Sequence, residues 1–216
     1  MKNFRHDPDC DICKNSQPFE MSSDLLRAVV DRRVALFAGA GVSTETPLVF
    51  PNTLYDEVRT ELSISDSPPF PELMQKYENQ PNGRSKLLSL IRKRMEYLND
   101  FIDVKIMATR FHEELATVPQ IQEIYTTNWD DLFEEQCRAV PFVTAQDFAF
   151  WHLPQRKVFK LHGSISNYGS LVITTRDYDK CYTNLRKGLI GSQLKVSLAT
   201  KTILFVGYSL SDYDFQ

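Results

Sequence analysis

The stretch VALFAGAGVS, residues 34–43, decides the fold, because an unbroken apolar run ends abruptly at glycine. Five apolar residues in succession are typical of a strand that is buried on both faces of a parallel sheet. The small residues Gly39, Ala40, Gly41 and Ser43 would let backbone N–H groups approach a pyrophosphate where a helix begins. Such glycines also occur where a turn simply packs closely against a helix. The motif alone leaves both interpretations open.

Four more runs have the length and apolar character of strands, and the segments between them are long enough for crossover connections. These runs are residues 121–126, 157–161, 171–174 and 202–206. Strands that alternate with helical segments favour parallel pairing with helices on both faces. We therefore predict an α/β fold, a Rossmann-like doubly wound parallel sheet.

Residues 53–118 have a different pattern, in which apolar residues recur at helical spacing. One face of a predicted helix carries four of them, Leu87, Ile91, Met95 and Leu98. This interval predicts a helical insertion lobe over the sheet. We divide the chain into an N-terminal tail, residues 1–21, and one domain, residues 22–216. A helix should follow the last strand, so we expect the protein to continue beyond residue 216.

Composition excludes several classes of protein. The 216 residues carry a formal net charge of -3, and no basic stripe with interleaved aromatic residues is present. Arg92-Lys93-Arg94 lies in a helical pattern and is interpreted as a solvated helix face. We predict no direct nucleic-acid binding. The apolar runs are too short for a bilayer of roughly 30 Å, and the polar N terminus does not resemble a signal peptide, so we expect a cytoplasmic protein without membrane association.

Cysteine spacing gives little support for a metal site. Cys10 and Cys13 form one CxxC pair near His6, whereas Cys137 and Cys181 stand alone. A tetrahedral zinc site needs a fourth ligand. We expect no metal and a reduced tail without a ligand.

Polar motifs follow the predicted strands at their carboxyl ends. Besides residues 39–43, they are Thr126–Asp130, His162-Gly163-Ser164 and Gly207–Leu210. The carboxyl ends of parallel strands border one crevice, so we expect these motifs to converge although they are far apart in the chain.

The polar side chains in these motifs allow two interpretations each. Asn128 and Asp130 either cap a helix or hydrogen-bond a ribose hydroxyl or a water. His162 is either a structural histidine or a general base, because imidazole exchanges protons near neutral pH.

The motifs, in this order, resemble the sirtuin family, and the resemblance spans residues 34–212. The segments Tyr125–Asp130, Lys160–Ser164, Ile173–Tyr178 and Gly207–Asp212 are similar to those of bacterial sirtuin-like NAD hydrolases of antiphage defence systems. The resemblance implies NAD as substrate, cleaved to nicotinamide and ADP-ribose.

Roles for individual residues follow from this resemblance. It implies Asn128, His162 and Asp130 as the catalytic group at the nicotinamide ribose. It implies that ten positions bind the dinucleotide or its ribose, namely Gly39, Ala40, Gly41, Ser43, Thr127, Asn128, Asp130, His162, Gly207 and Ser209.

Two departures separate the chain from sirtuin deacylases. Residues 44–51 replace the Gly-Ile-Pro-Asp-Phe-Arg segment of that branch, so its arginine is missing, and Cys181 is the only cysteine where the branch has two zinc-binding pairs. An NAD-dependent deacylase and a non-catalytic NAD or ADP-ribose binding module remain the alternatives. The resemblance also implies homo-oligomers and, in some systems, a co-encoded ATPase or other defence partner.

Overall fold

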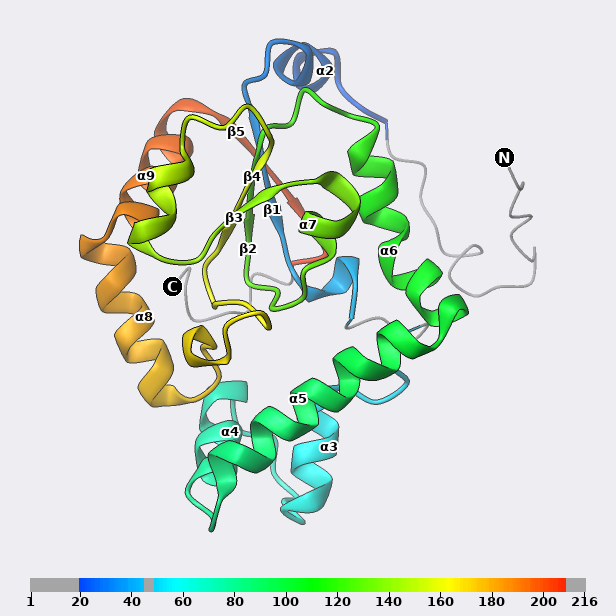
Figure 1. The fold of residues 1–216 in the computed structure, drawn as a ribbon, viewed down its shortest axis with the longest axis vertical. Coiled ribbons are helices and arrows are strands. Elements are labelled where there is room, and N and C mark those ends of the chain that lie inside the picture. The colour runs from blue at the N-terminus through cyan, green and yellow to red at the C-terminus, as the bar shows by residue number, and fades with distance from the viewer. Residues whose placement is uncertain (1–19, 45–48, 209–216) are drawn as a thin grey trace.

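A five-stranded parallel sheet forms the centre of the protein in the computed structural model, which describes residues 20–44 and 49–208 (Figure 1). The strands are β1 (Val34–Ala38), β2 (Glu123–Thr126), β3 (Val140–Phe142), β4 (Lys157–Lys160) and β5 (Thr202–Val206). Their order is β3-β4-β2-β1-β5, and every neighbouring pair is parallel. All five carboxyl ends therefore lie at one edge of the sheet, as the predicted Rossmann-like α/β fold requires.

Of the described helices, one precedes β1, and the others lie in the segments between successive strands. The helices are α2 (Ser23–Val30), α3 (Leu54–Glu61), α4 (Phe70–Glu78), α5 (Gly83–Asp100), α6 (Ile102–Ala116), α7 (Leu132–Cys137), α8 (Thr175–Lys187) and α9 (Leu189–Thr200). Short 3-10 helices are η1 (Ala40–Val42), η2 (Ala145–Phe150) and η3 (Tyr168–Ser170). Within the described ranges, no helix is long and apolar enough to cross a bilayer.

The central strand β1 explains how both faces of the sheet are covered. Successive side chains of a strand point to opposite faces. Val34, Leu36 and Ala38 pack in one apolar cluster with residues of α2, α6 and α7, whereas Ala35 and Phe37 pack in another with residues of α8 and α9. All five β1 residues are buried. This two-sided burial is why the run is continuously apolar, as the sequence indicated.

Helices α3, α4 and α5 lie together beyond the carboxyl edge of the sheet (Figure 1). Their buried side chains form a separate apolar cluster that includes Leu87 and Ile91 of α5. Helix α6, by contrast, packs on α7 and contributes Leu115 to a cluster of the sheet. That residues 53–118 form an insertion lobe with these limits remains a prediction.

One strand prediction was wrong, and one strand was missed. Residues 171–174 are buried but pair with no strand; the backbone N–H groups of Ile173 and Thr174 donate to the carboxylate of Asp177 in α8, each at 3.1 Å. The segment is apolar because Leu171 and Ile173 join the cluster of α3, α4 and α5. Strand β3 was missed because it has three residues and contains Pro141, a residue confined to edge strands.

Candidate active site

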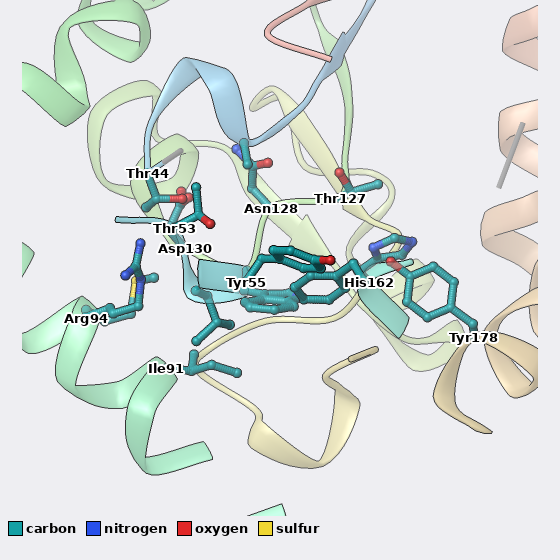
Figure 2. A pocket seen from close by; sticks show the side chains of 15 residues that line it. Thr44, Thr53, Tyr55, Ile91, Arg94, Thr127, Asn128, Asp130, His162 and Tyr178 are labelled. Atoms are coloured by element: carbon teal, nitrogen blue, oxygen red, sulfur yellow. The ribbon is translucent and has the colours of Figure 1, made fainter. Parts of the chain in front are cut away.

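A cavity of about 410 Å³ lies at the carboxyl edge of the sheet, between the strand ends and the helices α3 to α5 (Figure 2). It is lined by segments far apart in sequence, which contribute Ala40, Thr44, Thr53, Leu54, Tyr55, Phe70, Ile91, Arg94, Met95, Thr127, Asn128, Trp129, Asp130, His162 and Tyr178. Its volume falls in the range of small-molecule sites, about 300–1,000 Å³. The convergence predicted for Asn128, Asp130 and His162 is therefore present: all three line one cavity.

The glycine-containing loop after β1 is held against the end of β5. The Gly39 N–H donates to Val206 O, and the Gly41 N–H donates to Gly207 O, both at 3.0 Å. A Cβ at Gly39 would lie 2.5 Å from Gly207 O. The glycines are thus required for the close approach of two loops. Ala40 of this loop lines the cavity, and contact of the loop with a pyrophosphate remains a prediction.

Asn128 and Asp130 belong to one buried hydrogen-bond network beneath the cavity. The Asn128 Nδ2 donates to Gly39 O at 3.1 Å and to Ser43 Oγ at 3.2 Å. The Ser43 hydroxyl donates to Asp130 Oδ2 at 2.9 Å. Asp130 Oδ1 also accepts the Leu132 N–H at 3.3 Å, but Asp130 is not the helix cap considered from the sequence, because the N-cap residue of α7 is Asp131. Ser43 therefore connects the β1 loop to both polar residues of the β2 loop.

The network determines which way the Asn128 carboxamide points. Gly39 O only accepts hydrogen bonds, so the amide nitrogen must face it. The other amide atom, Oδ1, is buried and accepts no hydrogen bond from any residue that the structure describes. A buried acceptor without a donor costs free energy, about 1–3 kcal/mol. Because Asn128 lines the cavity, a bound hydroxyl or water is the donor that would satisfy Oδ1.

His162 lies two residues beyond the end of β4, at the end of the cavity where Tyr178 of α8 is found (Figure 2). The two ring centroids are 5.0 Å apart, with the rings edge to face. The next residue, Gly163, has a φ of +84°, and a Cβ there would lie 2.2 Å from Ser170 O. Glycine is needed at this turn because an L side chain disfavours that backbone conformation. The turn thus directs the imidazole toward the cavity.

Arg94 is buried, contrary to its predicted position on a solvated helix face. It is only 6% exposed and lines the cavity from α5. Its Nη1 lies 2.6 Å from Glu57 Oε1, and its guanidinium stands over the Phe50 ring at 4.0 Å. Arg92 and Lys93 are exposed as expected. The helical spacing of the sequence could have indicated this burial. Arg94 lies on the same helix face as three other buried residues of α5, which are Leu87, Ile91 and Leu98.

The remaining residues predicted for the site lie in different places relative to the cavity. Thr127 lines the cavity, whereas Gly207 contacts the β1 loop behind it. Ser209, and the tail cysteines Cys10 and Cys13 with His6, lie outside the described residues. Within residues 20–44 and 49–208, no three His, Cys, Asp or Glu side chains gather in a way that could hold a metal ion.

Comparisons with known proteins agree with this geometry. Residues 122–216 match the family model of the SIR2-like domain. The chain is 31% identical over 198 residues to the NAD(+) hydrolase ThsA of Enterococcus faecium, covering 88% of this chain and 40% of that protein. It is 31% identical over 201 residues to the protein of the same name from Cytobacillus dafuensis, covering 89% and 38%.

A more distant relative is the Defense-associated sirtuin 2 of Bacillus subtilis, 25% identical over 211 residues, covering 85% of this chain and 18% of that protein. The chain thus spans about 40% of the length of the hydrolase from Enterococcus faecium. The aligned relatives extend over most of the chain, including regions that precede the match to the family model. The fold, the cavity and these similarities agree with one another, and residues 122–216 match a SIR2-like domain.

Proposed function

We propose that this domain is an NAD glycohydrolase. In this reaction the bond between nicotinamide and C1′ of its ribose breaks, nicotinamide leaves with the bonding electrons, and a water oxygen bonds to C1′. The products are nicotinamide, ADP-ribose and one proton. The similarity to proteins named NAD(+) hydrolase supports this substrate.

One observation carries the proposal: Asn128, Asp130 and His162, from two different strand ends, line one cavity with a buried amide oxygen that lacks a donor within the described structure. Asn128 Oδ1 would accept a hydrogen bond from a ribose hydroxyl or from the attacking water. The amide is already oriented by two hydrogen bonds, so binding need not fix it again.

The other two side chains have complementary roles in this proposal. The His162 imidazole would take the proton released as water adds to C1′, a contribution typically worth about 100-fold to 10,000-fold in rate. Asp130 would hold the network through Ser43, and its buried charge would favour the cationic sugar that forms as the bond breaks, as carboxylates do in glycosidases. The pyridinium leaving group departs as a neutral molecule and needs no proton.

We further propose that the activity serves antiphage defence in the cytoplasm, as the relative named Defense-associated sirtuin 2 suggests. An NAD hydrolase that was always active would harm its own cell. We therefore infer that the domain acts as part of a homo-oligomer, with turnover controlled by assembly or by a co-encoded partner such as an ATPase.

The test is an NAD turnover assay on the purified protein, alone and with its native partner, following nicotinamide and ADP-ribose. Asn128→Ala and His162→Ala should each reduce turnover by at least about 100-fold. Matched controls are Asn99→Ala and His152→Ala, which change exposed residues of the same types and should retain activity. Undiminished turnover in both site variants would rule out Asn128 and His162 as the catalytic residues.

The same assay separates the two alternatives. Nicotinamide release that requires an acylated peptide identifies a deacylase. Tight binding of NAD or ADP-ribose with no turnover under any condition identifies a binding module.

A further inference from the structure

A lysine ammonium is completely buried beneath the loop that carries Asn128 and Asp130. Lys160 is the last residue of β4, and its side chain has 0% exposure. Its Nζ donates to the backbone carbonyls of Asp130 at 2.6 Å and of Trp129 at 3.3 Å. A buried ammonium is costly unless its protons are bonded, and here two of its acceptors belong to the candidate active-site loop.

Two carboxylates share the same ammonium. Lys160 Nζ lies 2.7 Å from Asp131 Oδ1 and 3.0 Å from Glu134 Oε1. Burial would raise the pKa of Asp131, but the Lys160 ammonium and two serine hydroxyls lower it overall. Burial prevails at Glu134 and, although opposed by Lys160, raises its pKa to about 7. Asp131 is the closer of the two carboxylates to Lys160 Nζ.

Asp131 extends the cluster to the segment that follows His162. Ser164 Oγ donates to Asp131 Oδ1 at 2.8 Å, and Ser166 Oγ donates to Asp131 Oδ2. The Ile165 N–H donates to Trp129 O at 2.8 Å, the same carbonyl that Lys160 binds. One ion pair, between the buried Lys160 and the partly buried Asp131, therefore contacts both segments whose side chains must meet at the substrate.

We propose that Lys160 is a positioning residue for NAD hydrolysis, which holds the Asn128 loop in register with the His162 segment. The inference rests on the proposed function. Lys160 itself contacts no substrate; it acts through the carbonyls of Trp129 and Asp130 and through Asp131. A small shift of either segment would separate the amide from the imidazole, and such misplacement lowers turnover more than substrate binding.

A purely structural ion pair is the competing explanation, and it makes a different prediction. Removing only the cation leaves two partly buried carboxylates uncompensated, which destabilises the fold, whereas neutralising the whole cluster often restores stability. A structural role predicts that activity returns together with stability. A positioning role predicts that stability returns without activity, because the carbonyls of Trp129 and Asp130 still lack the ammonium of Lys160.

The experiment therefore compares two variants with wild type. Lys160→Met removes the ammonium alone, and the triple variant Lys160→Met, Asp131→Asn, Glu134→Gln neutralises the cluster. For the triple variant we expect kcat for NAD to fall on the order of 10-fold to 100-fold, with KM changed by less than about 3-fold, at a melting temperature near that of wild type.

Lys157→Met is the matched control. Lys157 lies on the same strand, but its Nζ contacts carbonyls at the opposite end, Leu153 O at 3.1 Å and Gln155 O at 3.5 Å. Its kcat should equal that of wild type. Recovery of wild-type kcat in the triple variant, or an equal loss in Lys157→Met, would overturn the proposal.

Amide hydrogen exchange gives a readout that does not need turnover. In the triple variant, peptides covering residues 128–132 and Ile165 should exchange on the order of 10-fold faster, while β1 stays protected. If wild type hydrolyses no NAD, the proposed function fails, and exchange still decides whether Lys160 holds the two segments. Unchanged exchange in these peptides would overturn that claim as well.

Discussion

Replacing Gly163 by alanine should destabilise the protein and disturb the turn that carries His162. The residue has a φ of +84°, which costs an L side chain roughly 1–2 kcal/mol. The added Cβ would also stand 2.2 Å from Ser170 O, a backbone atom that cannot move aside as a flexible side chain would. With the displacement of that backbone included, we expect a loss of about 3 kcal/mol in the free energy of unfolding.

The assay is thermal unfolding followed by circular dichroism. For a chain of this size, about 3 kcal/mol corresponds to a fall in Tm of roughly 6–12 °C. Gly169→Ala is the matched control within the same loop, because its Cβ would meet only Asn167 Oδ1, at 3.4 Å. This control should change the free energy of unfolding by no more than about 0.5 kcal/mol.

Gly163→Ala should also lower activity. Because the turn sets the direction of the His162 imidazole, NAD turnover should fall in Gly163→Ala even at temperatures where the variant is folded. Equal melting temperatures for Gly163→Ala and Gly169→Ala would refute the argument from backbone conformation.

Three other perturbations test further parts of the site. Arg94→Leu removes a buried ion pair with α3 and should cost about 1–2 kcal/mol in urea unfolding, whereas Arg92→Leu, at a side chain 64% exposed, should be nearly neutral. Ser43→Ala removes the donor to Asp130 and should reduce nicotinamide release about tenfold. Burial raises the pKa of Glu134 from 4.5 to about 7. The stabilising contribution of Glu134 is therefore complete below about pH 4.5 and is lost as the pH rises through about 7. Glu134→Gln should flatten this part of the profile of unfolding free energy against pH, measured by unfolding at several pH values.

The parts of the fold that the sequence predicted are those in which burial and strand pairing coincide. The run 34–38 is apolar because the central strand is covered on both faces, so its pattern and its structure have the same cause. Residues 171–174 are equally apolar, but their burial comes from contact with α3, α4 and α5, and an apolar pattern does not distinguish a buried loop from a strand.

The candidate site was predictable where residues follow strands. Asn128, Asp130 and His162 could be grouped because parallel strands end at one edge. Arg94 and Tyr178 reach the cavity from helices whose placement over the sheet depends on tertiary packing, which local sequence does not specify. The role of Lys160 was equally inaccessible, because its partners belong to a different loop, about 30 positions away.

The position of Trp129 gives the molecule an internal optical reporter. The chain contains two tryptophans, and only Trp129 lines the cavity, with its indole Nε1 buried and its ring centroid 6.4 Å from that of Phe70. Trp151 lies elsewhere, stacked on Phe148. In a Trp151→Phe background the remaining fluorescence comes from the cavity wall. Ligand entry then becomes visible as quenching or a spectral shift in unlabelled protein, including variants that no longer turn over.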